Sequence, residues 1–165
     1  MERSGSHAIP GSAPDLTRAD APAVRDAAAI LARAEADEAA AGQARDRYRT
    51  RPMPALEPDA RIAPLLNPNE RVLAVRHGAI YDRRQSKPGS EVAVGVAGDV
   101  YVTSRRLVLV GRMTLSFGLP EIEEAVLSGE RLLLVMGDGT GISLDVAEPR
   151  LLRVEIGTAR AVART

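Results

Sequence analysis

Three basic residues in one short polar segment carry the clearest binding chemistry in the sequence: Arg83, Arg84 and Lys87. The planar guanidinium of an arginine can donate two parallel hydrogen bonds to phosphate oxygens, and backbone amides in a glycine-containing loop such as RRQSKPGS can add others. Asp82 and Glu91 flank the segment and reduce its local charge. The segment therefore fits either an anion-binding loop or an ordinary solvated loop.

A second pair of basic residues, Arg105 and Arg106, follows a Thr103-Ser104 turn and begins an apolar stretch. A guanidinium beside a turn can donate to backbone carbonyls, which favours a structural role for at least one of the two. The other interpretation is that the pair contributes to an anion site. The choice depends on whether these side chains converge with the upstream loop in the folded chain.

Residue types needed for catalysis or metal binding are scarce. The chain has no cysteine, which excludes disulfides, thiolate zinc sites and cysteine nucleophiles. His77 is the one histidine outside the N-terminal tail, so a histidine-based metal site lacks a second histidine, and no G-x-S-x-G nucleophile elbow occurs. The GDGTG segment lacks the lysine of a phosphate-binding loop and predicts a tight hairpin instead. We expect a non-enzymatic protein without metal or cofactor; an enzyme that uses His77 with a carboxylate is the alternative of that class.

Charge and composition narrow the class of protein. The 165 residues include 22 basic and 22 acidic side chains, so no net field attracts nucleic acid or membranes in bulk. Aromatic residues make up 2% of the chain, too few for a base-stacking platform. No apolar run approaches the ~18 residues that span a bilayer, and the N-terminus lacks the apolar segment of a signal peptide. We therefore expect a cytoplasmic protein that does not bind nucleic acid, and the excess of arginine over the single lysine, Lys87, points to a GC-rich bacterial genome.

The N-terminal third divides into three segments. Residues 1–19 are rich in Gly, Ser and Pro and are expected to form a disordered tail. Residues 20–50 predict an alanine-rich helix, with Asp20 as candidate N-cap, whose apolar face is too thin to build a core. That helix fits a solvated spacer that projects from the domain, or a helix that lies against a protein partner. Residues 51–68 carry five prolines and predict a semi-rigid linker whose second half packs on the domain.

Residues 69–165 predict one compact unit of about seven short strands followed by a helix, because turn signals recur roughly every eight to twelve residues. A bulge is expected at His77-Gly78, where the alternation loses phase, and hairpins are expected at Ser128-Gly129 and Asp138-Gly139. The segment EVAVGVAG is expected to add a short edge strand before VYVTS. The last segment, from Pro149, has one apolar helical face. Glu155 falls inside that face, and we expect it at the edge rather than paired with a basic residue on the sheet.

Four stretches of the sequence resemble the bacterial PH-like and GRAM-like domains, which are pleckstrin-homology-like barrels: GDVYVTSRRLVLVGR, SFGLPEIEEA, RLLLVMGDGTGISLDV and PRLLRVEI. The resemblance covers residues 66–163. It implies a mainly β fold, a PH-like barrel or orthogonal sandwich of about seven strands capped by a C-terminal helix, with a separate N-terminal helix.

The same resemblance implies positions for a ligand site. In PH domains that bind phosphoinositides, a basic set lies on the first strand and the loop after it, and the matching residues here are Arg76, Arg83, Arg84 and Lys87. The chain has no tryptophan, although such domains usually carry one in the final helix, and this favours the GRAM-like relatives.

These observations together predict a non-enzymatic binding or adaptor module that contacts a protein partner or an anionic membrane surface. The tentative site for an anionic ligand comprises six residues: Arg76, Arg83, Arg84, Lys87, Arg105 and Arg106. The helix at 20–50 would hold a second protein partner, and any lipid contact would be peripheral, at the inner face of the membrane. The alternative is a structural or assembly component of a larger bacterial complex, with that helix as the interacting element.

Overall fold

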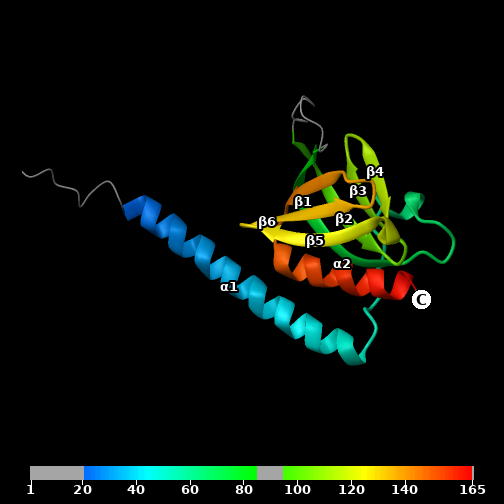
Figure 1. Ribbon diagram of the computed structural model, residues 1–165, viewed down its shortest axis with the longest axis horizontal. Helices are drawn as coiled ribbons and strands as arrows, with labels where there is room; N and C mark the ends of the chain where they lie inside the picture. The colour runs from blue at the N-terminus through cyan, green and yellow to red at the C-terminus, as the bar shows by residue number, and fades with distance from the viewer. Residues whose placement is uncertain (1–20, 85–94, 165) are drawn as a thin grey trace, which may run out of the picture. The chain divides into compact units, whose positions relative to one another are not determined.

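The computed structural model describes residues 21–84 and 95–164, and the expected tail at 1–19 and most of the RRQSKPGS loop lie outside them. Seven strands and two α-helices make up the described chain, together with two short 3-10 helices (Figure 1). In chain order these elements are α1 (Ala21–Thr50), η1 (Ala63–Leu65), β1 (Val72–Arg84), β2 (Val96–Thr103), β3 (Arg106–Gly111), β4 (Thr114–Gly118), η2 (Leu119–Glu121), β5 (Ile122–Ser128), β6 (Arg131–Met136), β7 (Gly141–Asp145) and α2 (Pro149–Ala163).

The strands form one antiparallel sheet in the order β4-β3-β2-β1-β7-β6-β5. The terminal strands, β4 and β5, are not paired with each other in the part of the chain that the structure describes, so the sheet is an open sandwich and not a closed barrel. The side chains of Leu152 and Ile156 on α2 are fully buried in the core between the two halves of the sandwich. The expected mainly β, seven-stranded PH-like sandwich with a C-terminal helix is confirmed.

β1 bends where the sequence predicted a bulge. Its register against β2 shifts between Arg76 and Ala79, and Gly78 has a φ of 68°, a left-handed conformation that glycine adopts without a steric penalty. Beyond the bend the strand pairs with β7 as well as with β2. The bend thus lets one strand belong to both halves of the sandwich.

β2 differs from the expectation of two separate short strands. It runs without a break from Val96 to Thr103 and includes the last three residues of the EVAVGVAG segment. Gly98, the last residue of that segment, lies opposite Gly111 of β3, and a Cβ on Gly98 would be 2.7 Å from the Val110 carbonyl oxygen. Glycine is needed here for a close approach of two strands inside the sheet, and not for a turn.

Both expected hairpins are confirmed, with β5 paired to β6 across Ser128-Gly129 and β6 paired to β7 across Asp138-Gly139. A second, smaller core lies on the face of β1, β2 and β3 that the main core does not use. It contains Ile62, which is fully buried, together with Tyr101 and Val108. The second half of the proline-rich segment therefore packs on the domain, as its apolar residues predicted.

The chain divides into two compact units, residues 1–32 and residues 33–165. In the first unit, the described part of α1 exposes Ile30 and Leu31. In the second unit, the remainder of α1 buries Ala41 and Ala44. The expectation of a projecting, solvated helix is therefore wrong for residues 33–50. Ala41 and Ala44 are buried on one face of this segment, whereas most of its other residues are exposed.

Asp37 explains how this part of α1 is held. Its side chain is buried, and its two carboxylate oxygens accept hydrogen bonds from the backbone N–H groups of Arg150 (2.8 Å) and Leu151 (2.9 Å). These are the N–H groups at the start of α2 that lack a backbone partner, because Pro149 has no N–H and the Leu152 N–H already donates to the Glu148 carbonyl oxygen. An N-cap is normally the residue just before the helix, whereas this cap comes from 113 residues earlier in the chain.

Replacing Asp37 by alanine should therefore lower the free energy of unfolding by about 1 to 3 kcal/mol, since two partly buried amide donors lose their partners. Urea denaturation followed by circular dichroism measures the change. Asp46→Ala is the matched control, because Asp46 lies on the same helix with an exposed side chain. Equal effects of the two substitutions would show that the cap does not stabilise the domain.

Candidate functional site

Arg106 belongs to a structural network around a buried carboxylate, that of Glu70. Its guanidinium donates to Glu70 (Nε to Oε1, 2.9 Å) and to the Leu65 carbonyl oxygen (2.6 Å), and the Thr103 hydroxyl also donates to Glu70 (2.6 Å). Burial alone would raise the pKa of Glu70, but the bonds from Arg106, Thr103 and the Asn67 amide lower it to about 2. Arg106 therefore joins the loop before β1 to the start of β3. Its neighbour Arg105 is exposed.

Arg76 is also engaged within the fold. Its Nη2 lies 2.9 Å from Glu155 Oε2 of α2 and 3.6 Å from Glu148 Oε2, and its side chain is 10% exposed. The expectation that Glu155 lies at the edge of the helix face is thus wrong, because it is buried and pairs with a basic residue on the sheet. A buried carboxylate needs such a partner, and the bulge in β1 directly follows the arginine that provides it.

Burial of Glu155 has an electrostatic consequence. It raises the pKa of the Glu155 carboxyl to about 7, the charges of Glu148 and Asp37 add to the rise, and Arg76 opposes it. The direction is opposite to that at Glu70, where hydrogen-bond donors dominate. The buried carboxyl of Glu70 therefore has a pKa of about 2, whereas the buried carboxyl of Glu155 has a pKa of about 7.

The six basic residues predicted as a site are consequently not equivalent. Arg76 and Arg106 have no interaction partner in common, and each donates a hydrogen bond to a different buried carboxylate. Arg83 and Arg84 end β1, where only their backbone is described, and Lys87 lies outside the described residues. The contacts of Arg76 and Arg106 therefore give no support to one anion-binding site made of all six residues. An anion site at Arg83, Arg84 and Lys87 stays a prediction.

His77 lies beside a buried carboxylate, its Nδ1 3.4 Å from Asp99 Oδ1. The same carboxylate already accepts a hydrogen bond from the Gly78 amide (3.1 Å) and pairs with Arg61. Since Asp99 also pairs with Arg61, the contact between His77 and Asp99 fits a structural role that stabilises the β1 bend better than a role in catalysis. The described residues also hold no group of three or more side chains of the kinds that bind metals.

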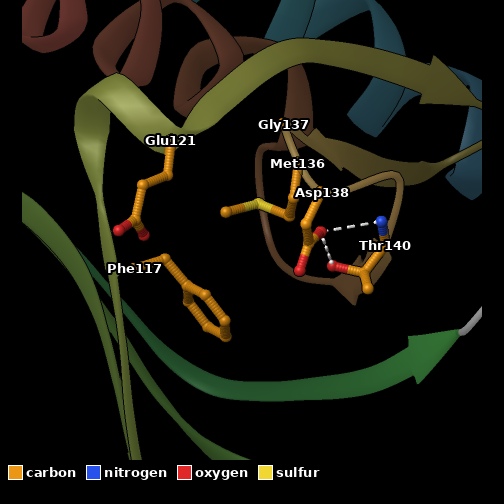
Figure 2. Close-up of a pocket in the computed structure, with 6 residues that line it drawn as sticks. All are labelled: Phe117, Glu121, Met136, Gly137, Asp138 and Thr140. Atoms are coloured by element: carbon orange, nitrogen blue, oxygen red, sulfur yellow. Dashed lines mark hydrogen bonds between the residues drawn. The ribbon is translucent and has the colours of Figure 1, made fainter.

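A pocket of about 400 Å³ lies between terminal strand β4 and the β6–β7 turn, and sequence reasoning did not anticipate it (Figure 2). β4, η2, β6 and the β6–β7 turn provide its lining residues: Phe117, Glu121, Met136, Gly137, Asp138 and Thr140. Its size is within the range of small-ligand pockets, about 300 to 1,000 Å³. The sequence signals were the single phenylalanine of the chain and the GDGTG segment, but nothing in the sequence brings them together.

The pocket combines an apolar surface with two carboxylates. The ring of Phe117 and the thioether of Met136 face the same space as the Glu121 carboxylate (Figure 2). Glu121 Oε2 accepts from the Gly118 amide (2.9 Å), and Asp138 Oδ1 accepts from both the amide (2.9 Å) and the hydroxyl (2.6 Å) of Thr140. Of the described residues that line it, none is basic. The arrangement can hold a ligand with a positive charge and an apolar or planar surface.

Comparisons with known proteins give similarities in structure only. No family model matches the chain, and no curated protein matches it. The pleckstrin homology domain of USP37 is similar at 19% identity over 53% of this chain and 96% of that chain (TM-score 0.42), and the Vps36 N-terminal PH domain at 17% over 67% and 92% (TM-score 0.46). The C-terminal domain of an unknown protein from Leishmania infantum is similar at 11% over 61% and 91% (TM-score 0.46). The fold class of this chain rests on its own strand order and C-terminal helix.

Neither described α-helix is long and apolar enough to cross a membrane.

The raised pKa of Glu155 predicts how stability changes with pH. The folded-state pKa of about 7 lies above the ordinary 4.5, so the stabilising contribution is fully present below about pH 4.5 and is lost as pH rises through 7. In the unsubstituted protein, Glu155 should lower the free energy of unfolding by about 1 to 3 kcal/mol between pH 5 and pH 8. We expect Glu155→Gln to remove this decline, as measured by urea denaturation at each pH. Glu124→Gln, an exposed change on β5, should keep the decline. An unchanged slope in Glu155→Gln would contradict the assignment.

Proposed function

We propose that this protein is a non-enzymatic binding module of the PH-like type, related to the GRAM-like domains of bacteria, and that its sandwich contacts a protein partner at the pocket between β4 and the β6–β7 turn. We further propose a cytoplasmic adaptor role, in which α1 holds a second partner. The observation that carries the proposal is the pocket itself, which is ligand-sized and combines an apolar surface with charge of one sign.

The lining chemistry supports binding rather than catalysis. No histidine, lysine, cysteine or serine occurs among the described residues that line the pocket. The hydroxyl of Thr140 donates to Asp138 within the same turn, and this bond accounts for the turn geometry without a substrate. The lining residues therefore favour a pocket that recognises a ligand by its shape and charge.

Residues 21–32 support the proposed role of α1. Ile30 and Leu31 are 47% and 60% exposed, whereas the following part of the helix buries Asp37, Ala41 and Ala44 within the domain. Of the described part of α1, the earlier segment is the one that exposes large apolar side chains, which suits contact with a second partner. The alternative, an assembly component that interacts through α1 alone, would use this segment and not the pocket.

Site-specific photo-crosslinking tests both contacts. We expect p-benzoylphenylalanine at position 140 to form adducts with a protein in the native cells, and the same residue at position 31 to form adducts with a different protein, each identified by mass spectrometry. Position 57 is the control, because Glu57 is exposed. Adducts from position 31 alone would support the assembly alternative, and equal labelling from all three positions would contradict both contacts.

A second candidate function, contact with an anionic membrane, is favoured by the β3–β4 turn. Gly111 pairs with Gly98 near the start of β2, so this turn lies at the same end of the sheet as the end of β1. The turn exposes Arg112 and Met113, the latter 61% exposed. A basic residue beside an exposed apolar one suits the surface of an anionic bilayer.

In this version the predicted residues Arg83, Arg84 and Lys87 bind the lipid phosphates. The protein should then co-sediment with phosphatidylserine vesicles and not with phosphatidylcholine vesicles, and triple substitution of these residues by alanine should abolish the binding, because a basic residue near such a surface contributes about 1 kcal/mol. Arg45→Ala is a control for the loss of positive charge at an exposed site. Vesicle binding that survives the triple substitution would exclude these residues as the lipid site.

A further inference from the structure

We propose that the pocket between β4 and the β6–β7 turn takes an arginine side chain presented by the partner protein. This inference rests on the proposed function and gives the occupant of its site. It follows from the fixed carboxylates, the apolar surface between them and the size of the space.

The first step concerns Glu121, whose carboxylate is oriented before any ligand arrives. Oε2 accepts the Gly118 amide at 2.9 Å, at the junction of β4 and η2. Oε1 has no hydrogen-bond partner among the described residues, although both oxygens of a carboxylate can accept. An ordered carboxylate with one oxygen left to bond is a ready acceptor for a cationic donor, because little side-chain entropy is lost on binding.

The second step concerns the opposite wall, which repeats the negative charge. Asp138 is oriented by the Thr140 amide and hydroxyl, and Glu123 lies close to the same wall, since a Cβ on Gly137 would be 3.6 Å from its Oε1. The charge of Glu123 acts on Arg160 of α2, which is not among the described residues that line the pocket. Glu121 and Asp138 thus face the cavity from different elements, and an anionic ligand would be repelled from it.

The third step concerns the apolar surface, which selects among cations. Phe117 is partly exposed and Met136 is buried, and both face the space between the carboxylates (Figure 2). A guanidinium is planar and weakly hydrated, stacks on an aromatic face and can donate to two acceptors at once, whereas an ammonium is a strongly hydrated point charge. Arginine therefore fits this lining better than lysine does.

The fourth step concerns size and source. A space of about 400 Å³ exceeds one side chain and would also hold the adjoining backbone of an extended segment. β4 is a terminal strand of the sheet, so a partner segment can approach the pocket without displacing another strand. The occupant we infer is an arginine within an extended stretch of a partner protein, and not a free anion or an acidic membrane surface.

Titration of the full-length, ¹⁵N-labelled chain with the blocked tripeptide acetyl-Gly-Arg-Gly-amide tests the inference by NMR. We expect saturable shifts at the amides of Gly118, Gly137 and Thr140, which border the pocket. The same tripeptide with citrulline, which keeps the shape of arginine without its charge, should bind at least about threefold more weakly, and the lysine tripeptide should fall between them.

Two variants that preserve the local hydrogen bonds locate the site. Glu121→Gln keeps an oxygen acceptor for the Gly118 amide, and Asp138→Asn keeps one for Thr140, so both should fold while losing one charge. Each should raise the Kd of the arginine tripeptide about three- to tenfold. Glu57→Gln removes the same charge from an exposed site outside the pocket lining and should leave the Kd unchanged.

Equal binding of the arginine and citrulline tripeptides, or an unchanged Kd in both pocket variants, would overturn the inference. These results are separable from a failure of the proposed function. Protein adducts at position 140 without selective arginine binding would support the proposed binding module and contradict arginine as its ligand. Selective arginine binding without protein adducts would support the pocket as an arginine-binding site and contradict the proposed contact with a partner protein.

Discussion

The position of α2 depends on a hydrogen-bonded cap that its own neighbouring residues do not provide. Glu148, the residue before the helix, is in a left-handed conformation with a φ of 54° and makes no side-chain cap. Asp37 supplies the cap instead, and Arg150 lies beside Asp37, Glu38 and Glu130 at the same point. Because α2 buries Leu152 and Ile156 in the main core, the contact that fixes its first turn also aligns the core of the sandwich.

Two arginines of low exposure in this fold pair with carboxylates of the chain itself. Arg106 pairs with the buried Glu70 and Arg76 with the buried Glu155, so each guanidinium lowers the pKa of a carboxyl that the fold takes out of water. Removing one partner of such a pair would leave an uncompensated buried charge, so neither arginine is available to a ligand without a cost in stability. Where the structure opens a pocket, the charge is negative and the cation is expected from outside the chain. The charge of this pocket is thus opposite to the charge of the site that the basic motifs suggested.

Most of the fold could be predicted from the sequence because it depends on local signals. Alternating apolar residues located the strands, Gly78 and Asp138-Gly139 marked the bend and a hairpin, and Pro149 marked the start of the last helix. Contacts between distant residues could not be predicted in the same way. Asp37 has no local signature as a cap, Glu155 looked like an error in an apolar face, and alanines in α1 gave no sign of burial. The pocket was missed for the same reason, since Phe117 and Asp138 meet only after the sandwich has formed.

The bend in β1 has a consequence for how the domain comes apart. Ile80 and Tyr81 pair with β2 on one side and with β7 on the other, so this short stretch of backbone is the hinge between the two half-sheets. Of the described strands, β1 is the one through which hydrogen bonding passes from the β2–β4 half to the β5–β7 half. Loss of order in this stretch of β1 would therefore break hydrogen bonds in both halves at once, which couples the two halves of the open sandwich.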